Sequence, residues 1–514
     1  MSFLDDVKKE LDNAKQLTEN GAVGYATSGK HLLDMNFAIP SYRSQSESRI
    51  KLDFTKAYYE NPTLAIAWLF YVRDIRGGLG ERRLFRVCME DLAQINEKVF
   101  VDLLPLVAEY GRWDDIFFWL GEINDRLDGA ILDLVATQFY KDFSGMNFGE
   151  PISLLAKWLP TENCSNADRK RKAKIVIEKL QLTPKAYRRA VSDLRKYLDV
   201  VEVKISNNDW DKVDYNAVPS NANLKYANAF MRHDEDRRIE YLESLKRGDK
   251  DVKINSSVLY PHDIVHKYTY DNIWETRVND YDETLEQLWK ALPNLVKEDT
   301  NTLVVADGSG SMTCEIGNSN VSALSVANAL AIYFSEHNKG NFANKYITFS
   351  SIPQLVDFSN ATTLRDKIQI ALGHDEISNT NIERVFDLIL DTAINNNYSQ
   401  SDMPNNIVII SDMEFDCMTT GDTSKAMFDA FVDKYAEHGY KLPRLVFWNV
   451  NSRTNTIPIQ QNESGVSLIS GFSVNLVNMV LSNETDPYVA LVKEITKERY
   501  YPILEVAFKN NLNN

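Results

Sequence analysis

The hydrophobic pattern of this 514-residue chain changes at about Asn301. Before that position, apolar residues recur at the spacing of amphipathic helices, as in residues 80–95 (GERRLFRVCMEDLAQI). After it, short apolar runs such as residues 302–306 (TLVVA) alternate with helical segments. We therefore expect a multidomain protein, with an all-α domain at residues 1–297 and an α/β domain at residues 298–514.

The first domain is expected to be built from helical repeats. Residues 62–74 (PTLAIAWLFYVRD) begin with proline and are almost wholly apolar, which is typical of a buried helix. Helical spacing continues through residues 99–107, 126–143, 168–182, 183–198, 221–232 and 282–295. Consecutive helices with short polar connections favour stacked, HEAT-like α-hairpins. Because the sequence shows no clear period, an irregular all-α domain is the alternative.

In the second domain, strands and helices are expected to alternate. The predicted strands are residues 302–306, 345–349, 354–358, 406–411, 444–449 and 467–470. The predicted helices are residues 322–337, 364–372, 382–395, 424–438, 475–481 and 487–497. This alternation predicts a parallel, doubly wound, Rossmann-like sheet.

Charge and cysteine content exclude several classes of protein. The formal net charge of −16 argues against a molecule that binds nucleic acid over its whole surface. The four cysteines, which form no CxxC pair, argue against a zinc module or a disulfide framework. The charged N-terminus lacks the apolar core of a signal peptide, and no apolar run is long enough for a membrane helix. We expect a cytoplasmic protein with no membrane association.

A candidate metal site follows the first predicted strand. Asp307, Ser309 and Ser311 form the motif DGSGS directly after residues 302–306. In open α/β sheets, ligands bind beyond the carboxyl ends of the strands, and Mg²⁺ or Mn²⁺ favours oxygen donors of this kind. Thr380 and Asp412 stand in later loops that are expected at the same edge. The alternative is that all five are turn and helix-cap residues.

The predicted metal shell is expected to bind a partner rather than to catalyse a reaction. One carboxylate with hydroxyls leaves a coordination position open, which an acidic residue of a protein partner would fill. Two-metal hydrolytic sites need more carboxylates than this set supplies. Asp416 follows in the same loop, where it either supports the metal ligands from behind or is solvated, and we expect it to be solvated. No other motif indicates an enzyme, so we expect no catalytic residues.

A local excess of positive charge points to a candidate nucleic-acid surface. Residues 166–200 contain eleven Lys and Arg against four Asp and Glu, a net of +7. Within residues 184–198, an apolar stripe alternates at helical spacing with cations that suit phosphate groups. These cations are Lys185, Arg188, Arg189, Arg195 and Lys196.

A second basic cluster surrounds Gly77 and Gly78, a pair that would let the backbone approach a phosphate closely. The cluster consists of Arg73, Arg76, Arg82 and Arg83, with Arg86 one turn further on. The alternative for both clusters is a solvated face or internal pairing with Asp and Glu. Trp113 and Trp158 could stack on bases, but we expect them to pack in the core.

Several motifs resemble those of the Ro autoantigen (TROVE-module) family and its uncharacterised relatives with the same layout. The chain carries DGSGSM at 307–312, which is similar to the metal motif of von Willebrand factor A domains. The N-terminal half contributes RDIRGGLGER at 73–82, YGRWDD at 110–115, LAKWLP at 155–160, LTPKAYRRAVSDLR at 182–195, AVPS at 217–220 and MRHD at 231–234. The resemblance covers nearly the whole chain and is closer to the uncharacterised relatives than to Ro itself.

The resemblance implies a ring of helical repeats closed by a von Willebrand factor A-like domain with a metal-ion-dependent adhesion site. It also implies a monomeric ribonucleoprotein component that binds small structured non-coding RNA. The acidic balance of this chain departs from Ro. The alternative function is a metal-dependent protein–protein interaction adaptor that does not bind RNA.

Overall fold

The computed structural model describes residues 15–271, 276–296, 301–317, 319–349, 351–375, 379–417, 427–458, 466–480, 484 and 486–511. These residues form two compact units. The helical unit contains residues 62–258 together with those from Glu498 onward, and the α/β unit contains those up to Asn61 together with residues 259–497. The expected combination of a helical region with an α/β region is therefore confirmed.

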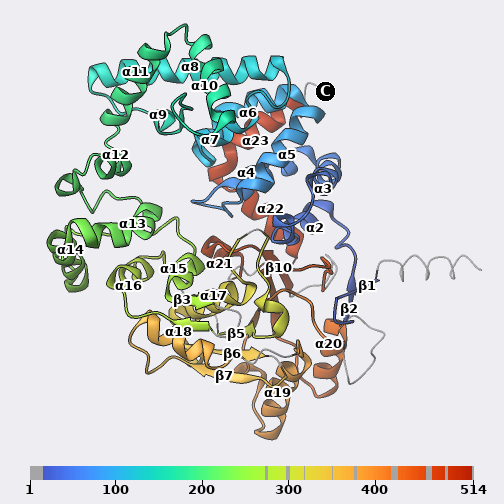
Figure 1. Ribbon diagram of the computed structural model, residues 1–514. Coiled ribbons are helices and arrows are strands. Elements are labelled where there is room, and N and C mark those ends of the chain that lie inside the picture. Colours follow the sequence, from blue (N-terminus) through green and yellow to red (C-terminus); the bar gives the residue numbers. More distant parts are fainter. Residues whose placement is uncertain are drawn as a thin grey trace, which may run out of the picture. The chain divides into compact units, whose positions relative to one another are not determined.

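Seven helices of the helical unit match predicted ones, namely α4, α5, α6, α8, α10, α11 and α13, whereas α7, α9, α12, α14 and α23 were not predicted. Figure 1 shows α10 and α11 lying along α8. Its helices are α4 (Pro62–Arg73), α5 (Arg82–Ile95), α6 (Glu97–Tyr110), α7 (Trp113–Trp119), α8 (Asp125–Phe148), α9 (Leu155–Trp158), α10 (Ala167–Lys179), α11 (Pro184–Tyr197), α12 (Val201–Ser206), η2 (Trp210–Lys212), α13 (Ser220–His233), α14 (Glu235–Arg247), η7 (Glu498–Tyr500) and α23 (Tyr501–Asn511).

Local sequence signals explain where these helices begin and end. The Thr183 hydroxyl accepts the backbone N–H of Ala186 and caps α11, and Pro184 occupies the first turn, where its missing N–H costs nothing. Helix α8 ends at Gly149, whose φ of 74° is readily adopted only by glycine. Helix α4 is apolar all round and is buried from Ala65 onward.

The last helix of the chain belongs to the helical unit. Helix α23 packs against α4 and α6. The Arg499 side chain pairs with Asp74, a fully buried carboxylate that also accepts the Tyr500 hydroxyl at 3.3 Å. The Tyr500 ring stacks on Tyr110 at 5.9 Å between centroids. Residues from Glu498 onward, which were expected within the α/β domain, therefore complete the core of the helical unit.

The α/β unit is built around a six-stranded mixed sheet in the order β10-β9-β8-β5-β6-β7. Its strands are β5 (Thr302–Asp307), β6 (Lys345–Phe349), β7 (Gln354–Asp357), β8 (Asn406–Ser411), β9 (Arg444–Asn449) and β10 (Val466–Ser470). Neighbouring strands run parallel except for β7, which pairs antiparallel with β6. The prediction of a parallel sheet is correct for five strands and wrong for β7, which reverses through a short turn after β6.

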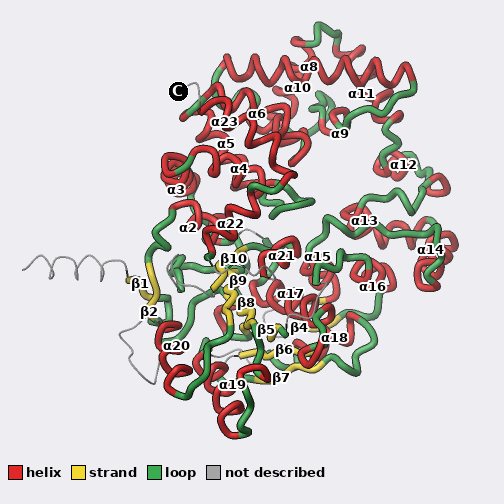
Figure 2. The backbone as a smooth tube through the Cα atoms, turned by 180° about the vertical axis from the view of Figure 1, so that it is seen from behind, coloured by secondary structure: helices red, strands yellow, loops and turns green. Residues whose placement is uncertain are grey.

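Several helices of the α/β unit pack on the sheet, and Figure 2 shows the strands and helices from behind. Helix α17 contacts β5, β6 and β8, whereas α20 packs on β9 through the Phe428 and Phe447 rings. The helices and short turns are α2 (His31–Phe37), η1 (Ser41–Arg43), α3 (Glu47–Glu60), α15 (Pro261–Tyr268), α16 (Glu283–Lys290), η3 (Gly310–Thr313), α17 (Ala323–His337), η4 (Gly340–Phe342), α18 (Leu364–Leu372), α19 (Glu383–Asn395), η5 (Gln400–Asp402), α20 (Met427–Glu437), η6 (Val474–Leu476), α21 (Val477–Val480) and α22 (Pro487–Ile495).

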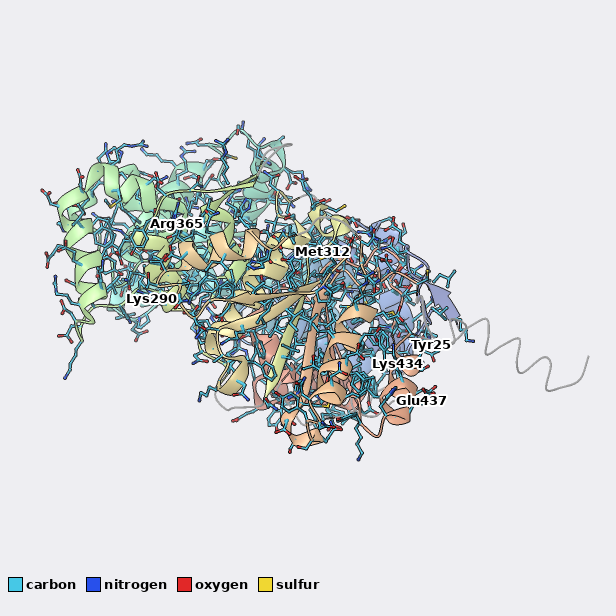
Figure 3. The ribbon with its side chains drawn as sticks, turned by 90° about the horizontal axis from the view of Figure 1, so that it is seen from below. Tyr25, Lys290, Met312, Arg365, Lys434 and Glu437 are labelled. Carbon is cyan, nitrogen blue, oxygen red and sulfur yellow. The ribbon has the colours of Figure 1, made fainter. Side chains whose placement is uncertain are left out.

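Residues near the N-terminus also belong to the α/β unit. Strands β1 (Lys15–Leu17) and β2 (Val23–Tyr25) form a hairpin, and β3 (Thr269–Asp271) pairs with β4 (Thr276–Val278). Tyr25 lies beside α20 in Figure 3, and its hydroxyl donates to Asp429 at 3.1 Å. The backbones of Tyr25 and Ile457 exchange two hydrogen bonds of 2.8 Å. The hairpin thus covers loops at the edge of the large sheet.

The two units divide the chain differently from the expected single boundary. The sequence predicts a change of domain at residue 297, whereas the compact units divide after Asn61, Val258 and Lys497. Residues 297–300 lie outside the described residues. Helix α16, expected in the all-α domain, packs within the α/β unit. Among the described residues, no helix has the length and apolar character needed to cross a membrane.

We predict that the pair between Arg499 and Asp74 stabilises the helical unit. Replacing Arg499 by Ala leaves the buried Asp74 carboxylate without its cation and should lower the free energy of unfolding by about 2 kcal/mol or more. Urea unfolding followed by tryptophan fluorescence measures the change. The control is Arg126→Ala, since Arg126 is 79% exposed in its pair with Glu97 and should change stability by less than about 1 kcal/mol. Equal effects of the two variants would contradict this role of Arg499.

Candidate functional site

The first candidate site lies where two neighbouring parallel strands end. Asp307 is the last residue of β5, and Asp412 directly follows β8. Because Ala306 lies opposite Ile410 in the sheet, the carboxyl ends of the two strands meet at one edge. Both carboxylates are buried, with exposed fractions of 1% and 0%. The structure thus brings these two predicted ligands to one place.

Hydrogen bonds hold the DGSGS loop in a fixed arrangement. The Asp307 carboxylate accepts the backbone N–H of Ser309 at 2.9 Å and the hydroxyl of Ser411 at 2.6 Å. The hydroxyl oxygens of Ser309 and Ser311 lie 3.1 Å apart. A Cβ at Gly308 would come within 2.8 Å of the Thr348 hydroxyl, so a larger residue would displace this loop. Hydroxyl and carboxylate oxygens therefore converge at the edge of the sheet.

Burial destabilises the charged form of both carboxylates. Burial raises the pKa of Asp307 to about 7, and the negative charge of Asp412 adds to the increase. Burial also raises the pKa of Asp412, although the nearby Arg453 charge and a hydrogen bond from Ser311 act in the opposite direction. Two buried carboxylates in this state favour a bound cation, which would stabilise both negative charges.

Arg453 supplies one positive charge to this edge. Its guanidinium donates to Asp412 at 3.0 Å and to Glu19 at 2.5 Å. The loop that carries Arg453 is anchored by Glu414, a fully buried carboxylate that accepts the backbone N–H of Arg453 at 2.7 Å and of Thr454 at 2.8 Å. Sequence reasoning missed both residues. The motif SDMEF after a buried strand was the available signal for Glu414, but no local pattern marks Arg453.

Thr380 reaches this edge through the N-terminal hairpin. Its side chain accepts a hydrogen bond of 3.3 Å from Asn20, which also donates to the backbone carbonyl of Glu414 at 2.6 Å. Its backbone N–H donates to Asp416 at 3.1 Å. Asp416 is thus half-buried and not fully solvated, and its carboxylate holds the backbone of Thr380. Contacts join Asp307, Ser309, Ser311 and Asp412 to one another, whereas Thr380 is linked to them through Asn20 and the loop after β8.

The composition of this set fits a hard divalent cation. Mg²⁺ and Mn²⁺ take oxygen donors, and two carboxylates with nearby hydroxyls provide them. Within the described part of the chain, no group of three or more His, Cys, Asp or Glu side chains is placed to hold a metal ion. The predicted set contains only two carboxylates and depends on hydroxyl oxygens for the remaining ligands. Arg453 would have to release Asp412 before that carboxylate could bind a metal directly.

The second candidate site, the basic cluster around Gly77, is divided between an internal ion-pair network and the surface, where Arg76, Arg82 and Arg83 are exposed. Arg73 is 3% exposed and pairs with the fully buried Asp115 at 2.7 Å. Arg86 binds the other oxygen of Asp115, also at 2.7 Å. Arg82 is half exposed and lies 3.7 Å from Asp114. Arg73 is thus unavailable to a phosphate, and its proposed role in RNA binding is corrected to that of a buried ion-pair partner.

The glycine pair has a packing role. A Cβ at Gly78 would lie 1.9 Å from the backbone carbonyl oxygen of Tyr71, so only glycine fits there. A Cβ at Gly77 would meet the Arg499 side chain at 2.7 Å. The close backbone approach predicted for this pair therefore exists, but it is made to the protein and not to a phosphate. Arg76 and Arg83 are exposed, and Arg76 donates to the carbonyl of Glu109 at 3.2 Å.

The third candidate site, on α11, keeps most of its predicted cations at the surface. Tyr187, Val191 and Leu194 are buried, as the apolar stripe predicts. Arg195 points inward, because its guanidinium donates to the carbonyls of Ala156 at 2.7 Å and Leu159 at 3.1 Å. The remaining four cations of the set are exposed, namely Lys185, Arg188, Arg189 and Lys196.

These exposed cations differ in how firmly they are paired. The Arg188 guanidinium lies 3.1 Å from the Glu162 carboxylate. Arg189 is 87% exposed and lies 3.9 Å from Asp193, a distance at which the pair contributes little. Of the two tryptophans, Trp113 is buried as expected. Trp158 is only half-buried and faces the Arg112 guanidinium at 5.5 Å from its ring centroid.

Two family models match adjoining parts of the chain. Residues 301–509 match a domain of unknown function, DUF7788, and residues 164–301 match another, DUF2828. The chain is also similar to the uncharacterized protein L728 of Acanthamoeba polyphaga mimivirus, with 29% identity over 91% of this chain and 84% of the viral protein. The two family matches meet at the position where the hydrophobic pattern changes.

We predict that the buried Asp307 makes the metal-free protein less stable as the pH rises. Its pKa is raised from 3.8 to about 7, so the folded state keeps a proton that the unfolded state has lost between these values. Stability should therefore fall across this window, by at most about 4 kcal/mol. Asp307→Asn should remove this dependence and stabilise the protein at neutral pH.

Urea unfolding in a chelator at pH 5 and at pH 7.5 measures the difference between Asp307→Asn and the wild type. Asp357→Asn serves as the control, because hydrogen bonds from Ser359 lower the pKa of that exposed carboxylate. The control variant should retain the loss of stability between the two pH values. If Asp307→Asn retains it as well, the Asp307 carboxyl is not the titrating group.

Proposed function

We propose that this protein is a Ro-like RNA-binding scaffold with a metal-dependent partner site. In this proposal the helical unit is a TROVE-like arrangement of HEAT-like helices that binds small structured RNA. The α/β unit is a von Willebrand factor A-like domain that binds Mg²⁺ or Mn²⁺ and, through it, a carboxylate of a partner protein. The exposed cationic face of α11 is the single observation that carries the RNA-binding part.

The geometry of α11 supports contact with phosphate groups. Four cations project from one helix whose opposite face is anchored by Tyr187, Val191 and Leu194. Tyr187 is fixed further by donating its hydroxyl to the carbonyl of Pro160 at 2.8 Å. A helix that is already folded loses little conformational entropy when its side-chain cations bind a phosphate backbone. The net positive charge of residues 166–200 attracts RNA despite the acidic balance of the chain.

The metal-dependent part rests on the four oxygen donors joined at the ends of β5 and β8. The low charge of this set and the hydroxyl oxygens suit a cation that retains an open position for an external carboxylate. We propose that the centre binds and does not hydrolyse, because two carboxylates are too few for a two-metal hydrolytic site. The protein is then a monomeric, cytoplasmic component of a ribonucleoprotein.

A metal-dependent protein–protein adaptor without RNA binding is the second candidate. The burial of Arg73 and the pairing of Arg188 with Glu162 favour it, since each removes a cation from the surface available to RNA. The adaptor and the scaffold share the metal centre. They differ in whether the protein binds RNA. The filter-binding experiment below tests this difference.

We predict that the protein binds Mn²⁺ and that Asp307→Ala abolishes binding while the α/β unit remains folded. Asp307 provides one of the two buried carboxylates of the proposed metal shell. Isothermal titration calorimetry with Mn²⁺ measures the affinity, and circular dichroism checks the fold. Asp391→Ala is the matched control, because Asp391 is an exposed aspartate of the same unit. Binding of equal affinity by Asp307→Ala and the wild type would exclude this site.

A companion variant tests the arrangement of charges in the centre. The Arg453 guanidinium forms an ion pair with the Asp412 carboxylate at 3.0 Å. In the proposed site it therefore competes with the metal ion for this carboxylate. Arg453→Gln should therefore strengthen Mn²⁺ binding severalfold. Weaker binding in this variant would mean that Arg453 organises the site instead of competing for Asp412.

We predict that Arg188→Glu with Arg189→Glu weakens RNA binding irrespective of sequence. Each lost phosphate contact should reduce the slope of log affinity against log salt by about 0.7, so the double variant should lose about one to two units. Filter binding of a small structured RNA over a salt series measures both quantities. The buried face of α11 is unchanged, so the fold should survive.

Lys246→Glu with Arg247→Glu is the matched control for this experiment. It makes the same change in net charge at the exposed end of α14 in the same unit. A general electrostatic effect would weaken binding equally in both double variants. Unchanged affinity in the α11 variant would leave the adaptor as the better description.

A further inference from the structure

A pocket of about 650 Å³ opens within the helical unit. Residues at the start of α7, on α9, on α12 and on α13 line it. Its volume lies within the range of about 300–1,000 Å³ that is usual for small-molecule sites, and is large for a lone inorganic ion. Apolar side chains such as Ile75 and Leu154 form part of its wall, and several cations and two aromatic side chains complete it.

Arg112 is a half-buried cation of this pocket that lacks a carboxylate partner among the described residues. Its side chain is half-buried, and its guanidinium lies 5.5 Å from the ring centroid of Trp158. Among the described residues, no carboxylate oxygen comes within ion-pair distance of it. Burial and the nearby charge of Arg73 lower the pKa of Arg112, against a smaller opposing effect of the Asp114 and Asp115 carboxylates.

The acidic residues of the pocket are already engaged. Glu202 pairs with Lys157 at 3.0 Å, and Asp199 pairs with Lys204 at 2.8 Å. The Asp214 carboxylate accepts the backbone N–H of Asn216 at 3.0 Å. These contacts leave Arg112 available to an anion, with two further lining cations, Arg76 and Lys225, that have no carboxylate partner among the described residues.

The two aromatic side chains add a second kind of contact. Trp158 and Tyr226 both line the pocket and are half-buried, so part of each ring remains accessible. Indole and phenol rings stack on planar bases, and an arginine guanidinium binds phosphate through two parallel hydrogen bonds. A ligand that satisfies both features carries a flat ring and a phosphate group.

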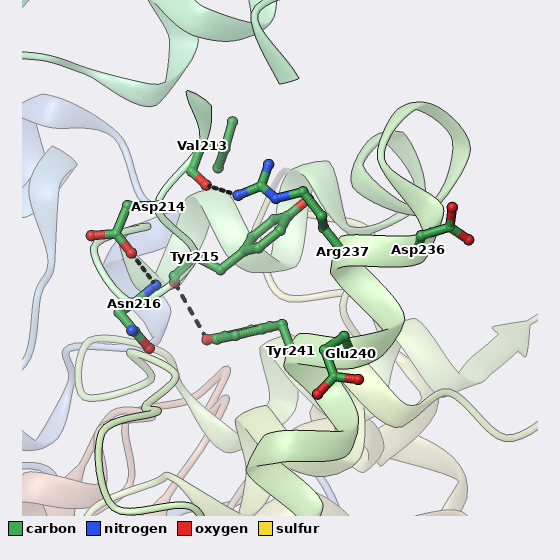
Figure 4. Close-up of a pocket in the computed structure, with 8 residues that line it drawn as sticks. All are labelled: Val213, Asp214, Tyr215, Asn216, Asp236, Arg237, Glu240 and Tyr241. Atoms are coloured by element: carbon green, nitrogen blue, oxygen red, sulfur yellow. Dashed lines mark hydrogen bonds between the residues drawn. The ribbon is translucent and has the colours of Figure 1, made fainter. Parts of the chain in front are cut away.

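A neighbouring pocket of about 440 Å³ differs from the first one in the charge of its lining. Figure 4 shows its lining, in which the Arg237 guanidinium donates to the carbonyl of Val213 at 2.8 Å. Three carboxylates line this second pocket, those of Asp214, Asp236 and Glu240, and Arg237 is its one lining cation among the described residues. An anion would be repelled there, whereas the first pocket retains uncompensated positive charge.

We propose that the pocket lined by Arg112 and Trp158 binds a nucleoside phosphate, with the phosphate held by Arg112 and Arg76 and the base against Trp158 and Tyr226. The nucleotide is either free or part of single-stranded RNA, since both present the same ring and phosphate. This site goes beyond the proposed contact of structured RNA with α11 and uses none of the α11 cations. It therefore stands even if α11 does not bind RNA.

Titration of the full-length protein with AMP, monitored by calorimetry, tests the proposal. AMP should bind saturably, and adenosine and inorganic phosphate should each bind about tenfold more weakly, because each lacks one of the two contacts. Arg112→Gln should weaken AMP binding by about tenfold or more. Arg126→Gln is the matched control, because that arginine is 79% exposed and outside the pocket, and should leave the affinity unchanged.

A second variant covers the case in which Arg112→Gln fails to fold. Lys225 is exposed on α13, so Lys225→Gln should preserve the fold and weaken AMP binding by up to about fivefold. An oligoadenylate tetramer identifies the source of the ligand: similar affinities for AMP and tetramer indicate a free nucleotide, and much tighter binding of the tetramer indicates single-stranded RNA. The proposal is overturned if neither ligand binds at millimolar concentrations, or if both bind equally to the wild type, Lys225→Gln and folded Arg112→Gln.

Discussion

The structure depends on providing each buried carboxylate with its own partners. Asp74, Asp115, Asp412 and Glu414 are all fully buried. A carboxylate without compensation in the protein interior is strongly unfavourable, so each must meet cations or N–H groups with good geometry. Asp115 is held by Arg73 and Arg86, Asp74 by residues of the C-terminal segment, Asp412 by Arg453, and Glu414 by the backbone of a distant loop.

These partnerships decide which positive charges remain for function. Arg73 and Arg195 both belong to basic stretches of the sequence. Arg73 nevertheless pairs with the buried Asp115, and Arg195 donates to backbone carbonyls. Arg188 and Arg189 remain at the surface of α11, and Arg112 remains in a pocket beside Trp158. The basic character of a segment therefore overstates the charge that it presents to a ligand. What matters is the positive charge left after the internal acids have been satisfied.

Chain topology brings together residues that are far apart in the sequence. The N-terminal hairpin supplies Asn20 to Thr380 and Glu19 to Arg453, so it takes part in the edge that carries the candidate metal centre. The C-terminal segment supplies Arg499 to Asp74 in the helical unit. The N-terminal residues thus complete the α/β unit, most of which comes from the C-terminal half of the chain. The C-terminal residues complete the helical unit, most of which comes from the N-terminal half. These long-range contacts are the reason that a single boundary at residue 297 does not describe the packing.

The sequence alone predicted many of the helices, five parallel strands and the position of the DGSGS loop, because hydrophobic periodicity and the order of strand and loop are local properties. Helices α3, α7, α14 and α23 were not predicted. It also predicted the buried stripe of α11 from spacing. Only the tertiary structure decided that β7 runs antiparallel, that Arg73 is buried, and that Glu414 and Arg453 belong to the centre. Those outcomes depend on contacts between side chains that lie hundreds of residues apart in the sequence. Such long-range contacts, and not neighbours in the chain, set the charge balance of a buried site.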